Sequence, residues 1–148
     1  MPEEPLQVTV GKFNFLIPKD LIYTDAGVWA AREGDRARLG LTDYAQQRSG
    51  DIAFAKVKAV RTRLQPGDEF AEIETVKVNE SLASPVQGII VVVNASLTEA
   101  PELINQDPYG KGWLAVVEIG DWERDRQRLL DAEAYAKLVK EQAESETK

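Results

Sequence analysis

The sequence predicts a mainly β fold with small helices, arranged as a sandwich or barrel with one helix at the C-terminus. Short apolar runs, separated by turn signals rich in Gly, Pro and Asp, recur along the first 119 residues, a pattern typical of many short strands. From Asp121 the apolar spacing changes to a helical period. The chain has 148 residues, enough for one domain with its own hydrophobic core.

The N-terminal residues predict a pair of strands. Apolar residues alternate with polar ones over 6–10 and again over 13–17, and a glycine lies between the two runs. This pattern favours a hairpin with glycine in the turn, or one strand interrupted by a bulge, and Pro18 ends it. We expect residues 1–5 to be disordered and residues 1–17 to form an N-terminal extension of the main domain.

Residues 21–60 predict four short strands and one helix. Thr42 is a suitable N-cap for a helix over 43–48, because its hydroxyl can accept a hydrogen bond from a free amide of the first turn. Ile52, Phe54 and Val57 are expected to face the core from the last strand. The strands are expected at residues 21–23, 28–32, 37–41 and 52–60.

The second half predicts a hairpin, two further strands and the C-terminal helix. A turn signal at 65–68 precedes the hairpin. Asn94 is expected to cap the segment after it, and a short helical piece is expected at 99–104. The main domain is expected to cover 18–142, with a polar tail over 143–148. The strands are expected at residues 70–73, 89–93 and 113–119, and the apolar stripe of the helix consists of Trp122, Leu129, Leu130, Ala134, Tyr135 and Leu138.

The composition limits the chemistry that the chain can perform by itself. Cysteine and histidine are both absent, which excludes thiol nucleophiles, Ser-His and Cys-His arrangements, disulfides and Cys/His zinc sites. Redox or acyl chemistry would therefore require a cofactor. The net charge is −7, from 18 basic and 25 acidic residues that are mixed along the chain, so no nucleic-acid partner is expected. Without a signal peptide, a spanning apolar run or cysteine, the chain is expected to be cytoplasmic and to have no membrane partner.

Lys77 is the main candidate for a functional residue. It lies between the apolar runs 70–73 and 88–93, at the predicted exposed end of a hairpin, and the β-branched residues Val76 and Val78 flank it. An exposed lysine that is rigidly held between recognition groups suits the covalent attachment of a prosthetic group, although most lysines in such a setting only face solvent. The acidic groups around it are Glu72, Glu74 and Glu80.

Other clusters are interpreted as structural. An acidic pair near Lys77 could act as general acid and base, but nothing in the sequence places it in a pocket that would shift a pKa. The glycine-rich segment 107–112 lacks the P-loop pattern and is interpreted as a loop. Core packing is expected for Trp29, Trp113 and Trp122, and a solvated helix face for Arg124, Arg126 and Arg128, which alternate with acids.

Several motifs occur in an order and spacing that together are highly specific. They are GDRARLGLTDYAQ at 34–46, GDI at 50–52, ETVK at 74–77, Pro85 and Gly88, VN at 93–94, PELIN at 101–105, DPYGKGWL at 107–114 and LLDAEAY at 129–135. In these motifs the chain resembles the H protein of the glycine cleavage system, a lipoyl carrier, and the similarity extends from Pro18 to Tyr135.

The resemblance implies a barrel-sandwich hybrid, similar to lipoyl domains, with a modified lysine at a hairpin tip. Lys77 matches the position where the family carries lipoate in amide linkage. Glu74 matches the position of an acid that the lipoate-attaching enzyme recognises. The chain would then be a non-catalytic carrier whose partners are lipoate-attaching enzymes and the enzymes that its arm serves.

Three features depart from the family pattern. Residues 25–29 read DAGVW, without the histidine that usually precedes the tryptophan, and residues 78–81 read VNES, where the family favours small residues followed by an acid. The N-terminal extension is the third. Because these changes lie where partners would bind, they favour the H-protein-like lipoate-binding proteins of bacterial sulfur oxidation. Their lipoyl group would carry sulfur intermediates or electrons for a heterodisulfide-reductase-like complex.

Two alternatives stay open. The first is a glycine cleavage H protein that carries the aminomethyl group for glycine decarboxylase components. The second is an interaction module that keeps the fold without the cofactor, which the presence of both Lys77 and Glu74 disfavours.

Overall fold

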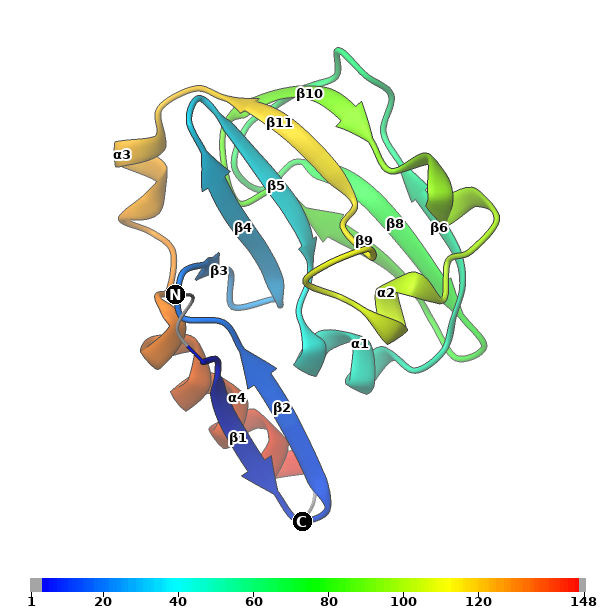
Figure 1. The fold of residues 1–148 in the computed structure, drawn as a ribbon, viewed down its shortest axis with the longest axis vertical. Helices are drawn as coiled ribbons and strands as arrows, with labels where there is room; N and C mark the ends of the chain where they lie inside the picture. Colours follow the sequence, from blue (N-terminus) through cyan, green and yellow to red (C-terminus); the bar gives the residue numbers. More distant parts are fainter. Residues whose placement is uncertain (1–3, 147–148) are drawn as a thin grey trace.

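The structure, a computed structural model, describes residues 4–146 (Figure 1). Part of the segment expected to be disordered, residues 1–3, lies outside the described residues. The strands are β1 (Leu6–Val10), β2 (Phe13–Ile17), β3 (Ile22–Tyr23), β4 (Val28–Glu33), β5 (Arg36–Leu41), β6 (Ile52–Val57), β7 (Arg63–Leu64), β8 (Glu69–Thr75), β9 (Asn79–Ala83), β10 (Gly88–Val93) and β11 (Ala115–Ile119). The helices are α1 (Asp43–Ser49), α2 (Leu103–Gln106), α3 (Trp122–Arg126) and α4 (Ala132–Glu146), with a 3-10 turn at Ala95–Thr98.

Three antiparallel sheets form the framework. The largest has the strand order β3-β4-β5-β11-β10-β7, the second has the order β6-β8-β9, and β1 and β2 form a separate pair. The main core joins the first two sheets and includes Leu39, Phe70, Ile73, Ile90 and Val117, all of them buried. The predicted mainly β fold with a C-terminal helix is confirmed.

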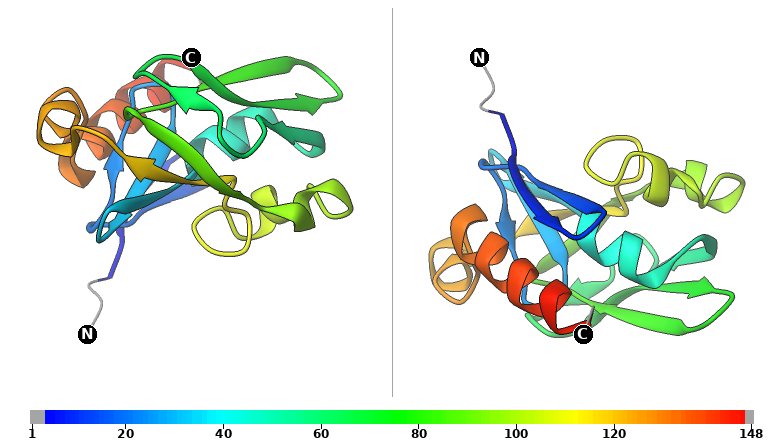
Figure 2. Two further views of the ribbon diagram at one scale, coloured as in Figure 1. Left: turned by 90° about the horizontal axis from the view of Figure 1, so that it is seen from above. Right: turned by 90° about the horizontal axis from the view of Figure 1, so that it is seen from below.

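A second hydrophobic cluster joins the two ends of the chain. The β1–β2 hairpin lies alongside α4 in the views of Figures 1 and 2. The backbone of Leu16 is also tied to the main domain, because its N–H donates to Asp43 Oδ2 at 2.9 Å and its carbonyl accepts from the Tyr109 hydroxyl at 2.6 Å. The buried members of this cluster include Ile17, Tyr23, Trp29, Tyr135 and Val139.

Strand β4 separates the two clusters, because successive side chains point to opposite faces. Val28 and Ala30 belong to the main core, and Trp29 belongs to the second cluster. The indole N–H of Trp29 donates to the carbonyls of Leu41 at 3.1 Å and Pro108 at 3.0 Å. Gly40 lies directly under the ring, since a Cβ there would be 2.4 Å from it. Core packing of Trp29 is thus confirmed.

The helical piece expected at 99–104 is wrong in its bounds. The Asn94 side chain accepts from Ser96 N at 3.2 Å and starts a 3-10 turn at once, over Ala95–Thr98. A new helix then begins only at Leu103, two residues past Pro101, which has no N–H to continue the ladder.

The C-terminal helix is divided in two. Leu130 exchanges two backbone hydrogen bonds with Tyr23, each 2.8 Å long, so the chain is extended where the stripe predicted helix. Asp131 then caps α4 by accepting from Ala134 N at 2.8 Å. This restart moves the buried face, and Ala134 is exposed. The expected tail boundary falls inside α4, which continues to Glu146 and whose buried residues are Ala132, Tyr135, Val139 and Ala143.

The expected core position of Phe54 is wrong, because β6 contains a bulge. Ile52 pairs with Thr75 and Phe54 pairs with Glu74, which leaves Ala53 without a partner in the ladder. The extra residue reverses the alternation of faces. Ile52 is therefore buried, whereas Phe54 is 51% exposed. The strand also ends at Val57 rather than residue 60.

We predict that Ile17→Ala lowers the free energy of unfolding by about 2–5 kcal/mol, because Ile17 is fully buried and the vacated space cannot close completely. Chemical denaturation of the purified protein measures this. The matched control is Leu16→Ala at the exposed neighbouring position, with a change within about 0.5 kcal/mol. Equal small effects of both variants would mean that the extension is not part of the core.

We also predict a loss of stability at alkaline pH. Burial raises the pKa of Tyr135 from 10.0 to about 12, with the Thr42 hydroxyl, 2.7 Å away, acting in the opposite direction. A raised pKa favours the neutral phenol in the folded state, so its contribution is complete below pH 10 and is lost between pH 10 and 12. Denaturant melts across this range should show a shallower decline for Tyr135→Phe than for wild type. Equal declines would contradict the assignment.

Candidate functional site

Lys77 lies in the turn between β8 and β9. This hairpin extends to the periphery of the molecule in both views of Figure 2. Three residues, Val76, Lys77 and Val78, connect the two strands, and all three side chains are exposed. Val76 is 96% exposed, which marks this connection as an outward-pointing turn. The exposed hairpin end expected for Lys77 is confirmed.

One side chain, that of Thr75, fixes the shape of this turn. The backbone N–H of Thr75 donates to the carbonyl of Val78 at 2.8 Å. Its hydroxyl oxygen accepts from the backbone N–H of Lys77 at 3.2 Å and of Val78 at 3.1 Å. The hydroxyl thus holds the turn through local side-chain-to-backbone hydrogen bonds, and none of residues 76–78 has a positive φ that would require glycine. Thr75 lies within the ETVK motif, and the signal that could have revealed its role is the tendency of Ser and Thr to form such local hydrogen bonds.

The base of the hairpin is anchored in the main core. Ile73 is fully buried, and Ile52 on the paired strand β6 is almost fully buried. On the other strand, Glu80 accepts a hydrogen bond from the Ser49 hydroxyl at the end of α1, at 3.0 Å. The lysine is therefore presented by strands that cannot shift without disturbing the core.

The acidic residues of the β8–β9 hairpin fall into two groups. Glu80 is bound to Ser49, and Glu69 accepts from the Ser81 hydroxyl and pairs with Lys58 at 3.1 Å, which lowers the pKa of Glu69. Glu72 and Glu74, by contrast, have no hydrogen-bond or ion-pair partner within residues 4–146. Glu74 is half-buried and stands opposite Phe54 and Asn79 in the sheet. Of the acids predicted around the lysine, Glu72 and Glu74 are thus available to a partner.

The reactive group that this site offers is the amine of Lys77. In the described part of the chain the ammonium group of Lys77 has no ion-pair or hydrogen-bond partner. No group of three or more acidic residues is placed to hold a metal ion there. An amide at Nζ would remove the positive charge without breaking any contact. The residues present therefore fit a covalently attached acyl group.

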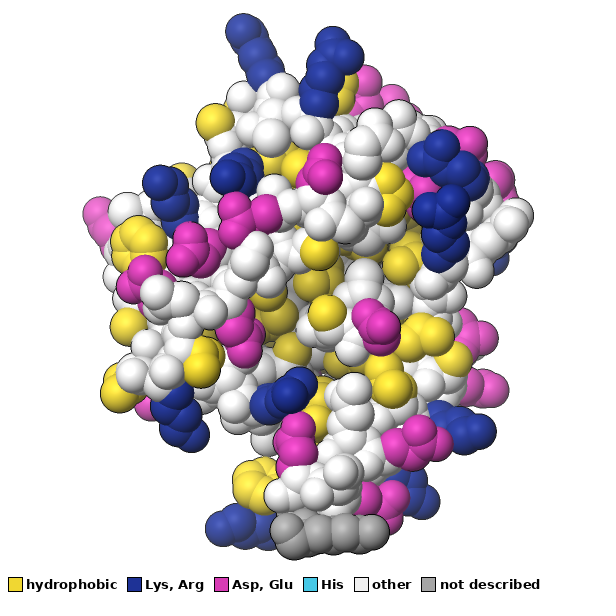
Figure 3. Space-filling view, turned by 180° about the vertical axis from the view of Figure 1, so that it is seen from behind, with side chains coloured by type: hydrophobic (Ala, Val, Ile, Leu, Met, Phe, Trp, Pro, Cys, Tyr) yellow, Lys and Arg dark blue, Asp and Glu magenta, His cyan; other side chains and the backbone are white. Residues whose placement is uncertain are grey.

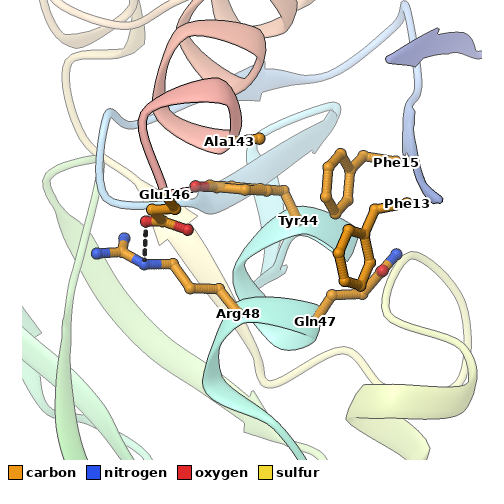
Figure 4. Close-up of a pocket in the computed structure, with 7 residues that line it drawn as sticks. All are labelled: Phe13, Phe15, Tyr44, Gln47, Arg48, Ala143 and Glu146. Atoms are coloured by element: carbon orange, nitrogen blue, oxygen red, sulfur yellow. Dashed lines mark ion pairs between the residues drawn. The ribbon is translucent and has the colours of Figure 1, made fainter. Parts of the chain in front are cut away.

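A cavity of about 220 Å³ lies elsewhere, between β2, α1 and α4 (Figure 4). Phe15 and Tyr44 meet edge to face at 5.0 Å, and Arg48 pairs with Glu146 at 3.0 Å beside them. Neither Lys77 nor Glu74 lines it. The cavity is formed by the contact between the N-terminal hairpin and the two helices, and it contributes no nucleophile to the lysine site.

The other sequence candidates have structural roles. Gly112 approaches the backbone of Leu103 so closely that a Cβ would lie 2.4 Å from its carbonyl oxygen, which explains the glycine-rich loop. In the predicted arginine face, Arg126 and Arg128 are exposed, whereas the alternating Asp125 is buried and accepts from Gln87 N at 2.8 Å. On the side of the molecule that Figure 3 shows, basic and acidic side chains are interspersed.

Comparisons with known proteins decide the family. The family model for the glycine cleavage H-protein matches residues 21–142. The chain belongs to the glycine cleavage H-protein family. The H protein of Rubrobacter xylanophilus is 45% identical over 126 residues, which cover 85% of this chain and 97% of that protein. The mitochondrial H protein 2 of Arabidopsis thaliana is 35% identical over 139 residues, which cover 93% of this chain and 88% of that protein.

A solved structure supports the same assignment. The H protein of Mycobacterium marinum has a TM-score of 0.71 and 33% identity, and the match covers 82% of this chain and 97% of that protein. The expected barrel-sandwich hybrid is thus confirmed. H proteins are non-catalytic carriers with lipoate covalently attached to a lysine, so the expected carrier class and cofactor are confirmed as well.

The comparisons favour the glycine-cleavage alternative over the sulfur-oxidation subgroup. The matched family and the named relatives are glycine cleavage H proteins, and none of these findings supports the heterodisulfide-reductase-like complex as a partner. Within residues 4–146, no helix combines the length and the apolar character needed to cross a bilayer.

We predict that Thr75→Val loosens the turn without unfolding the domain. The two amides that the hydroxyl holds, those of Lys77 and Val78, should exchange their hydrogens about five- to tenfold faster, as the loss of about 1 kcal/mol of protection implies. Amide hydrogen exchange with fragment resolution measures this. Thr75→Ser keeps the hydroxyl and should keep the protection. Unchanged exchange in the valine variant would show that the hydroxyl does not hold the turn.

Proposed function

We propose that this chain is the lipoyl carrier of a glycine cleavage system and that lipoate is attached through an amide to Nζ of Lys77. The observation that carries the proposal is the setting of Lys77: an exposed ammonium group that has no partner among residues 4–146, at the tip of a hairpin that is anchored in the core. When bound, lipoate supplies the two sulfur atoms that a chain without cysteine lacks.

The chain's own residues present the lysine and its flanking surface. Thr75 fixes the direction of the backbone at Lys77, and the buried Ile73 holds the strand that carries it. Glu74, three residues before the lysine, is proposed as the acid that the lipoate-attaching enzyme recognises, because its carboxylate is not engaged within the described chain. The proposed partners are the lipoate-attaching enzymes and the glycine decarboxylase components.

Because of the departures at residues 25–29 and 78–81, a test must distinguish a role in glycine cleavage from a role in sulfur oxidation. Both segments differ from the usual family pattern, and Val78 belongs to the turn that carries Lys77. A sulfur-carrying role would use the same lysine and the same arm, so lipoylation alone does not distinguish the two roles. Activity with glycine decarboxylase does.

We predict that Lys77→Arg abolishes lipoylation and leaves the thermal midpoint unchanged, because arginine keeps the charge but cannot form the amide, and the position is exposed. Intact mass with peptide mapping, after expression in lipoate-replete cells, measures the first effect, and thermal melting measures the second. Lys56→Arg, at another exposed lysine of the same sheet, should be lipoylated normally. A lipoyl increment on a residue other than Lys77 would contradict the assignment.

A second experiment tests the cargo. The lipoylated protein, glycine and pyridoxal phosphate are offered to a glycine decarboxylase, and exchange of carbon dioxide into glycine is followed. We expect exchange that depends on lipoylated Lys77 and is absent in Lys77→Arg. If a fully lipoylated protein supports no exchange with a competent decarboxylase, the result would contradict the glycine-cleavage role and favour the sulfur-oxidation role.

A further inference from the structure

We propose that Phe54 is an apolar docking contact for the lipoate-attaching enzyme, an inference that rests on the proposed attachment of lipoate to Lys77. Nothing in the sequence pattern marks this residue, since an aromatic side chain in a short strand is ordinarily a core residue. Its position in the sheet, its exposure and its neighbours point to the role.

The first argument is the bulge in β6. Ile52 and Phe54 are two residues apart and would share a face in a regular strand. The bulge at Ala53 keeps Ile52 in the core and turns Phe54 outward, so the ring is 51% exposed. Beyond the bulge, Ala55 and Val57 pack against the core again. β-Bulges commonly redirect a side chain beside a functional site.

The ring of Phe54 lies next to Glu74, the proposed recognition acid. Phe54 pairs directly with Glu74, and Glu74 pairs with Asn79 at the start of the returning strand. The spacing of residues within and between strands places the Cα atom of Phe54 roughly 10 Å from the Cα atom of Lys77. The ring and the free carboxylate therefore stand side by side on the outer face of the sheet that carries the lysine.

The third argument is the gathering of exposed apolar side chains at this end of the molecule. Of the seven large hydrophobic residues that are exposed within residues 4–146, three, namely Phe54, Val76 and Val78, lie in this turn or opposite Glu74. Exposed apolar groups beside unpaired acids favour a partner with an apolar pocket flanked by basic groups. Aromatic side chains are the type that most often dominates such contacts.

Among the proposed partners, the attaching enzyme is the one whose reaction takes place at Lys77 itself. This enzyme forms a bond to Nζ, so its active site must reach the end of a lysine side chain and its surface must cover the turn and the adjacent strands. Enzymes that act after attachment meet the reactive ring at the far end of a long arm. They can reach it without covering the strands next to Lys77.

The test measures lipoylation of the purified apoprotein by a lipoate ligase with lipoate and ATP. Phe54→Ser should raise the KM for the apoprotein and lower kcat/KM about tenfold, with kcat nearly unchanged, because the ring binds the enzyme and does not touch the reacting nitrogen. Phe54→Leu should restore most of the efficiency. The matched control is Phe13→Ser, at an exposed phenylalanine of β2, which should be lipoylated like wild type.

Three outcomes overturn the proposal. Normal lipoylation of Phe54→Ser would show that the ring is not a contact. Failure of Phe54→Leu to restore efficiency would show that an apolar contact is not what matters. A fall in kcat with an unchanged KM would place the effect in the chemical step. If wild-type protein itself is not lipoylated at Lys77, the proposed function fails, whereas normal lipoylation of wild type and Phe54→Ser alike removes only this inference.

Discussion

The pairing of β8 with β6 and β9 is the interaction on which the lysine site depends. Ile73 and Ile52 of this sheet are buried in the main core and fix the strands next to the turn, while the Thr75 hydroxyl fixes the turn itself. A carrier has to hold its attachment point in a constant position and leave the amine free. Both needs are met here: backbone hydrogen bonds and buried side chains order the turn, while the Lys77 side chain has no hydrogen-bond or ion-pair partner in the described part of the chain.

The six-stranded sheet packs against this sheet through the main core, and it contacts the second hydrophobic cluster through Trp29 of β4. β4 and β5 separate two hydrophobic clusters, and Trp29 closes the second one against Gly40, where only a glycine leaves room for the indole. The N-terminal hairpin and α4 complete that second cluster, with Tyr23 and Tyr135 stacked at 4.6 Å. The extension outside the matched family region is therefore bound to the domain by burial as well as by hydrogen bonds.

The chemistry of the chain follows from its composition and this architecture together. Without cysteine or histidine it offers no thiol and no imidazole of its own, which agrees with a carrier class and a borrowed reactive group. The acids of the hairpin differ in their contacts: Glu69 and Glu80 stabilise it, whereas Glu72 and Glu74 have no hydrogen-bond or ion-pair partner within residues 4–146 and are the ones proposed for recognition. The outward Phe54, paired with Glu74, would extend the proposed recognition surface onto the neighbouring strand.

The sequence by itself determined the mainly β fold, most strand positions, the Thr42 cap and the exposed tip at Lys77, because these depend on local alternation and turn chemistry. Its motifs also determined the family, while the departures from them pointed to a sulfur-oxidation role that the comparisons do not support. Only the tertiary structure decided the outward position of Phe54, the break at Leu130 and the buried face of α4. A bulge and a backbone bridge to Tyr23 arise from pairing between distant segments, which local periodicity does not record.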